Sequence, residues 1–317
     1  SLAYNESVTI ALRGSIDTEA MRTAIKALTQ RHDVLRAVLS RDGTELLIQQ
    51  DAGQALIVDD LSNLPEDEAD ATLTSLVAGE SANAFDLVNG PLFRARLISL
   101  TANEHALVLG AHHIVCDGFS FAILIRDLAE LYRNAVTGVL AALPPADSFA
   151  DYAAGLAAAQ SQTDEPTEDE LYWLEQFKRG LPAPLDLPTS RPRSAQRSFA
   201  SARLDLSVKP ELVRQIRQLA GQTRSGAFAV LLTGFATLMA RLSGQQDLVI
   251  GVPSAGQTTV NSETLVGHCV NLLPLRVPVE LNQSTREAIN QVQQHVFDAF
   301  DHQRYTYGSL LKKLPIE

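Results

Sequence analysis

Strand-like and helix-like patterns of apolar residues alternate along the whole chain. Residues 8–12 and 105–111 are short runs of strand length, whereas residues 119–131 place apolar side chains at helical spacing. Beyond the middle of the chain, residues 209–220 follow an amphipathic helical pattern and residues 226–243 a mostly apolar one. Because strand and helix patterns are interspersed, the sequence predicts an α+β fold of mixed sheets with helices.

A stretch rich in proline and arginine, residues 182–193, interrupts these patterns and is the best candidate for a domain boundary. Strand and helix patterns recur on both sides of it. We therefore predict an N-terminal lobe over residues 1–175, an inter-lobe linker over residues 176–197 and a C-terminal lobe over residues 198–317.

The candidate site lies where the strand pattern of residues 105–111 passes into the following helix. Two adjacent histidines, His112 and His113, end the strand, and Asp117 with Gly118 forms the turn into the helix. Adjacent residues of a strand point to opposite faces, so one imidazole faces the packed interior and the other can face a cavity. Asp117 is suited to fix the turn or bind a cation, and Gly118 to adopt positive φ or to let the backbone approach a ligand.

Several residues of metal-ligating type occur in this region and later in the chain. They are His112, His113, Cys116, Asp117, His268 and Cys269. Neighbouring histidines on opposite faces of a strand cannot easily bind one ion, and the spacing matches no common zinc pattern. We therefore predict no metal site.

Composition narrows the class of protein. With 45% hydrophobic and 20% charged residues among 317, the chain has the balance of a globular protein. Its net charge of −11 argues against a nucleic-acid partner, and its two cysteines suit a reducing cytoplasm. The most apolar run, residues 226–240, is shorter than the roughly 20 residues that span a bilayer, so we expect no membrane partner.

The double-histidine segment, H-H-I-V-C-D-G, resembles the H-H-x-x-x-D-G signature of condensation domains of nonribosomal peptide synthetases. Two further segments support the resemblance. Residues 31–36 are similar to the family's R-H-E-x-L-R motif, with Asp33 in place of glutamate, and residues 266–276 are similar to V-G-x-F-V-N-T-x-x-x-R. The resemblance covers the chain from end to end, with the motifs in the family's order.

The resemblance implies two lobes similar to chloramphenicol acetyltransferase, arranged as a V-shaped pair with the active site in a tunnel between them. It implies amide bond formation between a carrier-bound acyl or peptidyl thioester and a carrier-bound aminoacyl group. The expected partners are donor and acceptor peptidyl carrier proteins, or an acyl carrier protein as donor, and adjacent synthetase domains in one polypeptide. No cofactor is expected in the domain itself, because the substrates are attached to the phosphopantetheine of the carrier proteins. Since the family continues beyond the segment that ends at Glu317, we also expect a truncated C-terminal lobe.

The resemblance further implies roles for the residues of the double-histidine segment. His113 would act as a base or as the acceptor that positions the amine, because the ordinary pKa of histidine lies near neutrality. His112 would have a structural role on the opposite face. The backbone at Gly118 would approach the substrate.

Four other matched residues are expected to support the site. We hypothesise that Asp117 pairs with Arg276 across the lobe boundary and so holds the loop of His113. Asn271 either lines the tunnel or is simply a turn residue. Arg31 and Arg36 are expected to be structural despite their charge.

Two other functions stay open at this point. Epimerisation domains share the double histidine, but they carry E-G-H-G-R-E where this chain has residues 266–271, which contain no glutamate. A non-catalytic docking module of the same fold could recruit carrier proteins without chemistry. The intact His113 and Asp117 favour catalysis.

Overall fold

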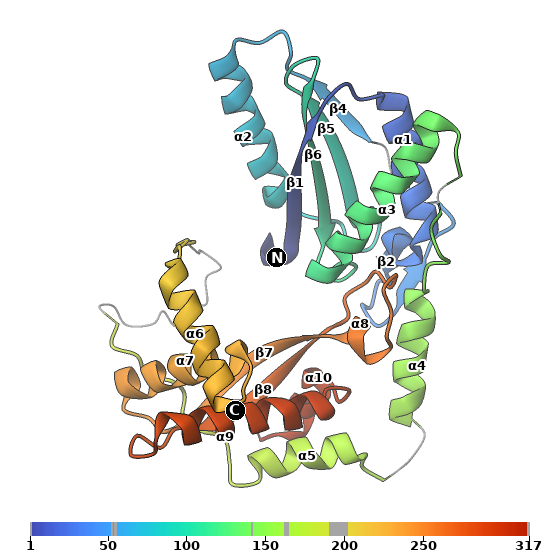
Figure 1. Ribbon diagram of the computed structural model, residues 1–317. Coiled ribbons are helices and arrows are strands. Elements are labelled where there is room, and N and C mark those ends of the chain that lie inside the picture. Colours follow the sequence, from blue (N-terminus) through green and yellow to red (C-terminus); the bar gives the residue numbers. More distant parts are fainter. Residues whose placement is uncertain are drawn as a thin grey trace. The chain divides into compact units, whose positions relative to one another are not determined.

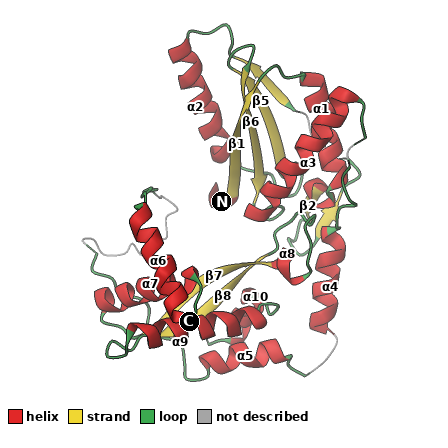
Figure 2. Cartoon of the chain, in the orientation of Figure 1, coloured by secondary structure: helices red, strands yellow, loops and turns green. Residues whose placement is uncertain are grey.

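The computed structural model describes residues 2–51, 53, 56–140, 142–161, 165–189 and 202–315 (Figure 1, Figure 2). The chain forms two compact units. The first comprises Ser1–Gln162 with Gln257–Cys269, and the second Thr163–Gly256 with Val270–Glu317. Each unit combines helices with a small sheet, so the predicted α+β class is confirmed.

The units do not coincide with the predicted lobes. The segment Gln257–Cys269 packs with the first unit, although it follows the predicted linker by 60 or more residues of sequence. Hydrogen bonds of this segment to Asp117 and Ser120, described below, are the physical reason. The first residues of the predicted linker, 176 and 177, end a helix, and residues 190–197 lie outside the described part of the chain.

The first unit is built from a four-stranded sheet, a small hairpin and the helices around them. Its helices are η1 (Leu2–Tyr4), α1 (Thr18–Arg31), η2 (Asp33–Arg36), α2 (Glu66–Ala82), α3 (Gly118–Thr137) and α4 (Phe149–Ser161). Its strands are β1 (Asn5–Arg13), β2 (Ala37–Leu39), β3 (Leu46–Ile48), β4 (Ile57–Asp60), β5 (Phe93–Ser99) and β6 (Glu104–His112). The large sheet has the order β1-β6-β5-β4, with only the β4–β5 pair parallel, and β2 pairs with β3.

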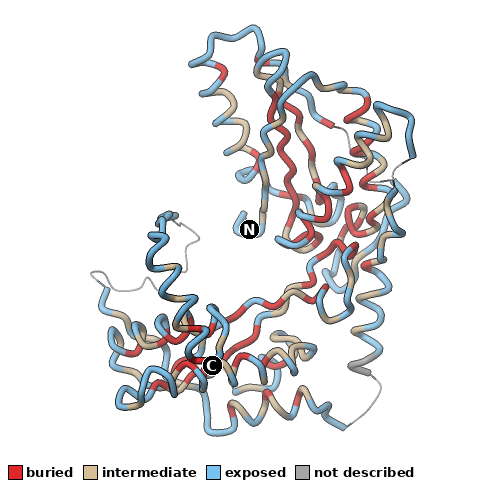
Figure 3. Tube along the Cα trace, viewed as in Figure 1, coloured by how far each residue is buried: buried red, intermediate tan, exposed pale blue. Residues whose placement is uncertain are grey.

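Strand β6 lies inside this sheet and is covered on both faces (Figure 3). Leu107 and Leu109 pack into the cluster that includes side chains of α1 and α3, whereas Ala106 and Val108 pack into a second cluster with α2. Burial on both faces explains why residues 105–111 are continuously apolar rather than alternating. It also fixes the register of the strand that carries the two histidines, since a shift of one residue would turn every side chain to the opposite face of the sheet.

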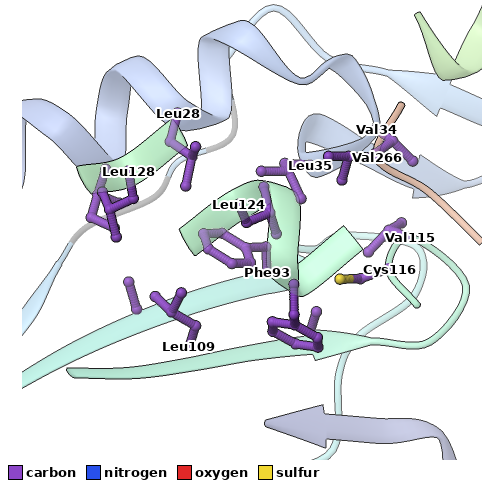
Figure 4. Packing of buried hydrophobic residues seen from close by; sticks show 14 of the residues in the cluster. Leu28, Val34, Leu35, Phe93, Leu109, Val115, Cys116, Leu124, Leu128 and Val266 are labelled. Atoms are coloured by element: carbon purple, nitrogen blue, oxygen red, sulfur yellow. The ribbon is translucent and has the colours of Figure 1, made fainter. Parts of the chain in front are cut away.

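The core between the sheet and helices α1 and α3 contains fully buried aliphatic and aromatic side chains. Leu28 of α1, Leu124 of α3 and Phe93 of β5 are each completely inaccessible. Val266, from the segment that returns to this unit, belongs to the same cluster (Figure 4). Burying such side chains contributes about 1.5–3 kcal/mol each, so this contact holds the returning segment in place.

The second unit contains a two-stranded sheet and helices around it. Its strands are β7 (Asp247–Ala255) and β8 (Val270–Pro278), which pair antiparallel. Its helices are α5 (Glu168–Phe177), α6 (Pro210–Thr223), α7 (Ala227–Ser243), α9 (Thr285–Asp301) and α10 (Tyr307–Lys313). The one-turn helix α8 (Gly256–Thr259) follows β7 directly, and from residue 257 on it belongs to the first unit. Trp173 of α5 and Leu273 of β8 are central to the core of this unit.

The helices predicted over residues 209–220 and 226–243 correspond to α6 and α7. The alternation of apolar and polar residues over 198–206 also predicts a strand, but this is wrong for the described part, residues 202–206, which has no regular secondary structure. Among the described helices, none is by itself long and apolar enough to cross a membrane. Helices α6 and α7 reach that length and composition only as a pair that is bent by 103°.

A buried carboxylate joins α1 to α3. Asp127 of α3 is completely inaccessible, and it accepts hydrogen bonds from Arg31 (2.8 Å), His32 (3.0 Å) and Arg126 (3.0 Å). Burial alone would raise the pKa of Asp127, but these three donors outweigh it and hold the pKa well below its usual range. The charged carboxylate is therefore the stable form in the folded protein.

Replacing the carboxylate of Asp127 tests its contribution to the stability of the folded protein. Asp127→Asn should lower the free energy of unfolding by about 3–5 kcal/mol, because it leaves buried donors without a charged partner. Since the folded pKa is lowered, the stabilisation is present above the ordinary aspartate pKa of about 4 and is lost as the pH falls further. Urea denaturation between pH 3 and pH 7 measures both effects.

Glu130 is the matched control, since it lies on the same helix and forms an exposed pair with Arg133. Glu130→Gln should change the free energy of unfolding by no more than about 0.5 kcal/mol. Equal losses for the two variants would contradict the importance assigned to Asp127.

Candidate active site

The two adjacent histidines end β6 and face different surroundings, as their positions on a strand predict. His112 is 9% exposed and packs edge-on against Phe85, with ring centroids 6.0 Å apart. Its Nδ1 accepts a hydrogen bond from the backbone N–H of Ile114 at 3.2 Å. Burial lowers the pKa of His112, so its imidazole is neutral near pH 7 and serves the packing of this turn.

His113 lies between a carboxylate and a second imidazole. Its side chain is 28% exposed, and Nε2 is 3.1 Å from Oε1 of Glu6 on β1. On the other side, Nδ1 is 3.1 Å from Nδ1 of His268, and the two rings are nearly perpendicular at a centroid distance of 4.8 Å. The backbone N–H of His113 donates to the carbonyl of Tyr4 at 2.7 Å. A partly exposed imidazole with a fixed orientation is thus presented at the strand end.

Asp117 is the N-cap of α3 and is completely buried. Its Oδ1 accepts from the backbone N–H of Ser120 at 2.8 Å, and Oδ2 accepts from the backbone N–H of Cys269 at 3.1 Å. The side-chain amide of Gln257 donates to both oxygens, at 3.2 and 3.1 Å. Asp117 therefore ties the start of α3 to the segment 257–269.

The predicted ion pair between Asp117 and Arg276 is wrong. Arg276 binds Asp247 through Nε (3.0 Å) and Nη2 (2.6 Å), and its Nη1 donates to the carbonyl of Gln176 at 2.7 Å. All of these partners lie in the second unit, while the described partners of Asp117 lie in the first. A bidentate carboxylate satisfies the guanidinium geometry locally, which the sequence motif did not reveal.

Ser120 and Gly267 form a second link between α3 and the returning segment. The hydroxyl of Ser120 is 2.8 Å from Oδ1 of Asp117 and 3.0 Å from both the backbone N and the carbonyl O of Gly267. A Cβ on residue 267 would lie 2.1 Å from Cδ2 of Phe149, well inside van der Waals contact. Only glycine allows the segment to pass this closely.

Gly118 begins α3, and it is exposed. It is not among the glycines with positive φ, so that part of the prediction is wrong. A Cβ added at Gly118 would meet no atom within 4 Å. The open space means that the protein's own packing does not require glycine here, and approach of a ligand to this backbone stays a prediction.

The two cysteines of this region are buried beside Asp117. Burial, reinforced by the charge of Asp117, raises the pKa of the Cys116 thiol well above its usual range and that of Cys269 to about 12. Neutral thiols are poor nucleophiles and poor metal ligands. Within the described part of the chain, no group of three or more His, Cys, Asp or Glu side chains is arranged to hold a metal ion.

The remaining matched residues make contacts with backbone groups of their own unit. Arg31 donates to Pro144 O at 2.5 Å in addition to Asp127, and Arg36 donates to the carbonyls of Thr29, Gln30 and Gln49.

In the second unit, the amide of Asn271 donates to the carbonyls of Gln303 (2.8 Å) and Tyr305 (2.9 Å) and accepts from the N–H of Tyr307 at 3.0 Å. Asn271 thus holds a loop of that unit. Asn271 itself lies in strand β8, so the alternative of a turn residue is wrong, and its place along a tunnel stays a prediction.

Four residues of the site were not singled out from the sequence as site residues. Glu6, Ser120 and Gln257 do not belong to any of the motifs that the sequence shares with the family. His268 was considered only as a metal ligand. Its position in the segment similar to V-G-x-F-V-N was a signal, because an imidazole there falls next to residues that match the family.

Because residue 267 passes so close to Phe149, adding a single methyl group there should lower the stability of the protein considerably. Gly267→Ala should destabilise the protein by about 1–3 kcal/mol or more, because the methyl group would overlap the phenyl ring. Thermal unfolding measures the loss. Gly79→Ala in α2 is the matched control, since its Cβ would meet nothing within 4 Å and alanine favours a helix by about 0.5–1 kcal/mol. Similar melting temperatures for the two variants would contradict the steric argument.

Comparison with known proteins gives matches along the whole chain. A family model for the condensation domain matches residues 1–317. Phosphinothricin tripeptide synthetase PhsC of Streptomyces viridochromogenes is 36% identical over 319 residues, which is 99% of this chain and 29% of PhsC. Tyrocidine synthase 2 of Brevibacillus parabrevis is 32% identical over 315 residues, 99% of this chain and 8% of that synthase. The chain therefore spans only a small part of these relatives.

Solved structures with the same fold include two that are 25% or more identical. The SgcC5 protein of Streptomyces globisporus superposes with a TM-score of 0.80 at 26% identity, covering 99% of this chain and 70% of SgcC5. The first condensation domain of the calcium-dependent antibiotic synthetase superposes with a TM-score of 0.77 at 25% identity, covering 99% and 74%. Matched over its whole length, this chain belongs to the condensation domain family of nonribosomal peptide synthetases.

Proposed function

We propose that this chain joins a carrier-bound acyl or peptidyl thioester to the amine of a carrier-bound aminoacyl group, with His113 as the base that accounts for the proton lost by the amine. Membership of an amide-forming family supports the reaction. The observation that carries the assignment of His113 is its partly exposed imidazole, oriented by Glu6 and His268 at the end of β6. His112 is buried against Phe85 and is the structural member of the pair.

The chemistry requires modest assistance. An α-amine has an ordinary pKa of about 8, so a useful fraction is neutral near pH 7, and the thiolate is a fair leaving group. Alignment of two tethered substrates can lower the barrier by roughly 7–11 kcal/mol. A placed base adds about 10²–10⁴-fold in rate by removing the proton from the tetrahedral adduct. Histidine suits this role because its ordinary pKa lies near the working pH.

The start of α3 is suited to stabilise the oxygen of the tetrahedral adduct. Gly118 is exposed at the first turn of this 20-residue helix, with open space beside its Cα. The helix N-terminus carries a partial positive charge, which would stabilise the negative charge that develops on the thioester oxygen. In this proposal, the backbone at Gly118 approaches the substrate while the carboxylate of Asp117, buried behind it, only fixes the helix start.

The partners follow from the same proposal. Donor and acceptor peptidyl carrier proteins, or an acyl carrier protein as donor, would present their substrates on phosphopantetheine, and the domain itself would bind no cofactor. The much greater length of PhsC and tyrocidine synthase 2 supports adjacent synthetase domains in one polypeptide. The cytoplasmic location expected from the sequence stays a prediction.

A single-turnover assay tests the proposal. The intact protein is mixed with donor and acceptor carrier proteins that are loaded with a panel of aminoacyl groups, and amide formation is followed by mass spectrometry of the carriers. His113→Ala should slow product formation by about 10²–10⁴-fold, because the placed base is lost. His295→Ala, in α9 of the second unit, is the matched control and should react at the wild-type rate.

Three outcomes are informative. Loss of rate in His113→Ala with an unchanged melting temperature supports the proposal. Equal rates for the wild type and His113→Ala reject His113 as the base. Binding of the carriers without amide formation across the panel favours the docking module instead.

A further inference from the structure

The segment that carries the second imidazole of the site is anchored on both sides of it. His268 is exposed, but the residues on either side of it in sequence are anchored. The backbone of Gly267 is hydrogen-bonded to Ser120, and the N–H of Cys269 donates to Asp117. The contact between Nδ1 of His268 and Nδ1 of His113 therefore joins two anchored segments of one unit.

The contacts of His113 determine which nitrogens carry protons. An ionised carboxylate only accepts hydrogen bonds, so the Nε2 that faces Glu6 carries the proton of the neutral imidazole. Nδ1 of His113 is then the unprotonated nitrogen, and the Nδ1 of His268 that faces it must donate. His268 consequently has its lone pair on Nε2. The opposite arrangement would turn a lone pair of His113 toward the negatively charged carboxylate.

In this state the lone pair of His113 is occupied by the hydrogen bond from His268, and the other unprotonated nitrogen of the two rings is Nε2 of His268. We propose that His268 is a proton-relay residue, which takes the proton lost by the attacking amine and passes another to His113. This inference rests on the proposed amide-forming function and deepens it. It places two imidazoles, rather than one, on the path of the proton.

The relay balances in protons and charge. When the adduct loses its proton, the N–H bond of the amine breaks and a bond to Nε2 of His268 forms. At the same time the Nδ1–H bond of His268 breaks and a bond to Nδ1 of His113 forms. His268 ends neutral with its tautomer exchanged, and His113 ends as an imidazolium. When the C–S bond of the thioester breaks, the reverse transfers deliver one proton to the sulfur, so the sites return to their starting state.

The surroundings favour a positive charge on His113 over one on His268. An imidazolium at His113 lies 3.1 Å from the carboxylate of Glu6. Although the side chain of His268 is exposed, the partial loss of water around its ring lowers its pKa, and a charge on His113 lowers that pKa further, against smaller opposing influences of Asp117 and of the backbone of His113. His112 and the thiols of Cys116 and Cys269, which belong to the same region, are neutral near pH 7. Two imidazoles at 3.1 Å hold one extra proton together, not two.

Two variants separate proton relay from mere support. His268→Asn keeps an N–H donor near the position of Nδ1 but cannot exchange protons. His268→Ala removes the side chain and leaves room for free imidazole. In the single-turnover assay with the intact protein, both should lose about 10²-fold or more of the wild-type rate. Added imidazole should restore much of the rate of His268→Ala, and should not affect the wild type or the control His295→Asn.

The outcomes distinguish this inference from the proposed function. If His113→Ala is slow and His268→Asn reacts at the wild-type rate, the relay is wrong and the proposed function stands. If His113→Ala forms the amide as fast as the wild type, His113 is not the base and the relay falls with it. If the wild type itself forms no amide, the proposed function is wrong. A slow His268→Ala that imidazole fails to rescue, with normal melting, assigns His268 a purely structural role and overturns the relay. Slow variants, imidazole rescue and a pH–rate profile that shifts in His268→Asn together support it.

Discussion

The site depends on one buried carboxylate. Asp117 is completely inaccessible, and its described partners are neutral donors: the N–H of Ser120, the hydroxyl of Ser120, the amide of Gln257 and the N–H of Cys269. A buried charge is costly unless its lone pairs are satisfied, so these donors are required rather than optional. Because they come from α3 and from the segment 257–269, the charge joins parts of the chain that are about 140 to 150 residues apart.

Asp117 and its donors thus form a rigid support for the partly exposed histidines of the site. Ser120 and Gly267 reinforce the link, and the passage of Gly267 against Phe149 leaves no space for a side chain. Val266 inserts into the core of the first unit on the same segment. His268 is carried by this anchored segment, and His113 by a strand buried on both faces. Their two imidazoles therefore meet at hydrogen-bonding distance without being buried themselves.

Motif residues divide between chemistry and support. Arg31, Arg36 and Arg276 carry charge, yet each is engaged by carboxylates or carbonyls of its own unit. The side-chain nitrogen and oxygen of Asn271 both form hydrogen bonds with the backbone of one loop. Guanidinium and amide groups present several donors in fixed geometry, which makes them effective at joining backbone segments. A match to a family motif thus identifies a residue that matters, but its contacts decide whether it supports the structure or faces the substrate.

The sequence alone determined what depends on local pattern. The apolar run of β6, the turn at Asp117 and Gly118, the start of α3 and the opposite orientations of His112 and His113 all follow from strand and helix periodicity, whereas α3 extends six residues beyond the pattern of residues 119–131. Family membership followed from the order of short motifs. Only the tertiary structure decided which distant groups meet: Glu6 and His268 beside His113, Gln257 and Cys269 around Asp117, and Asp247 rather than Asp117 beside Arg276. Periodicity predicts to which face of its own strand or helix a side chain points. The pairings of distant residues depend instead on how separate segments pack, and no local pattern connects those segments.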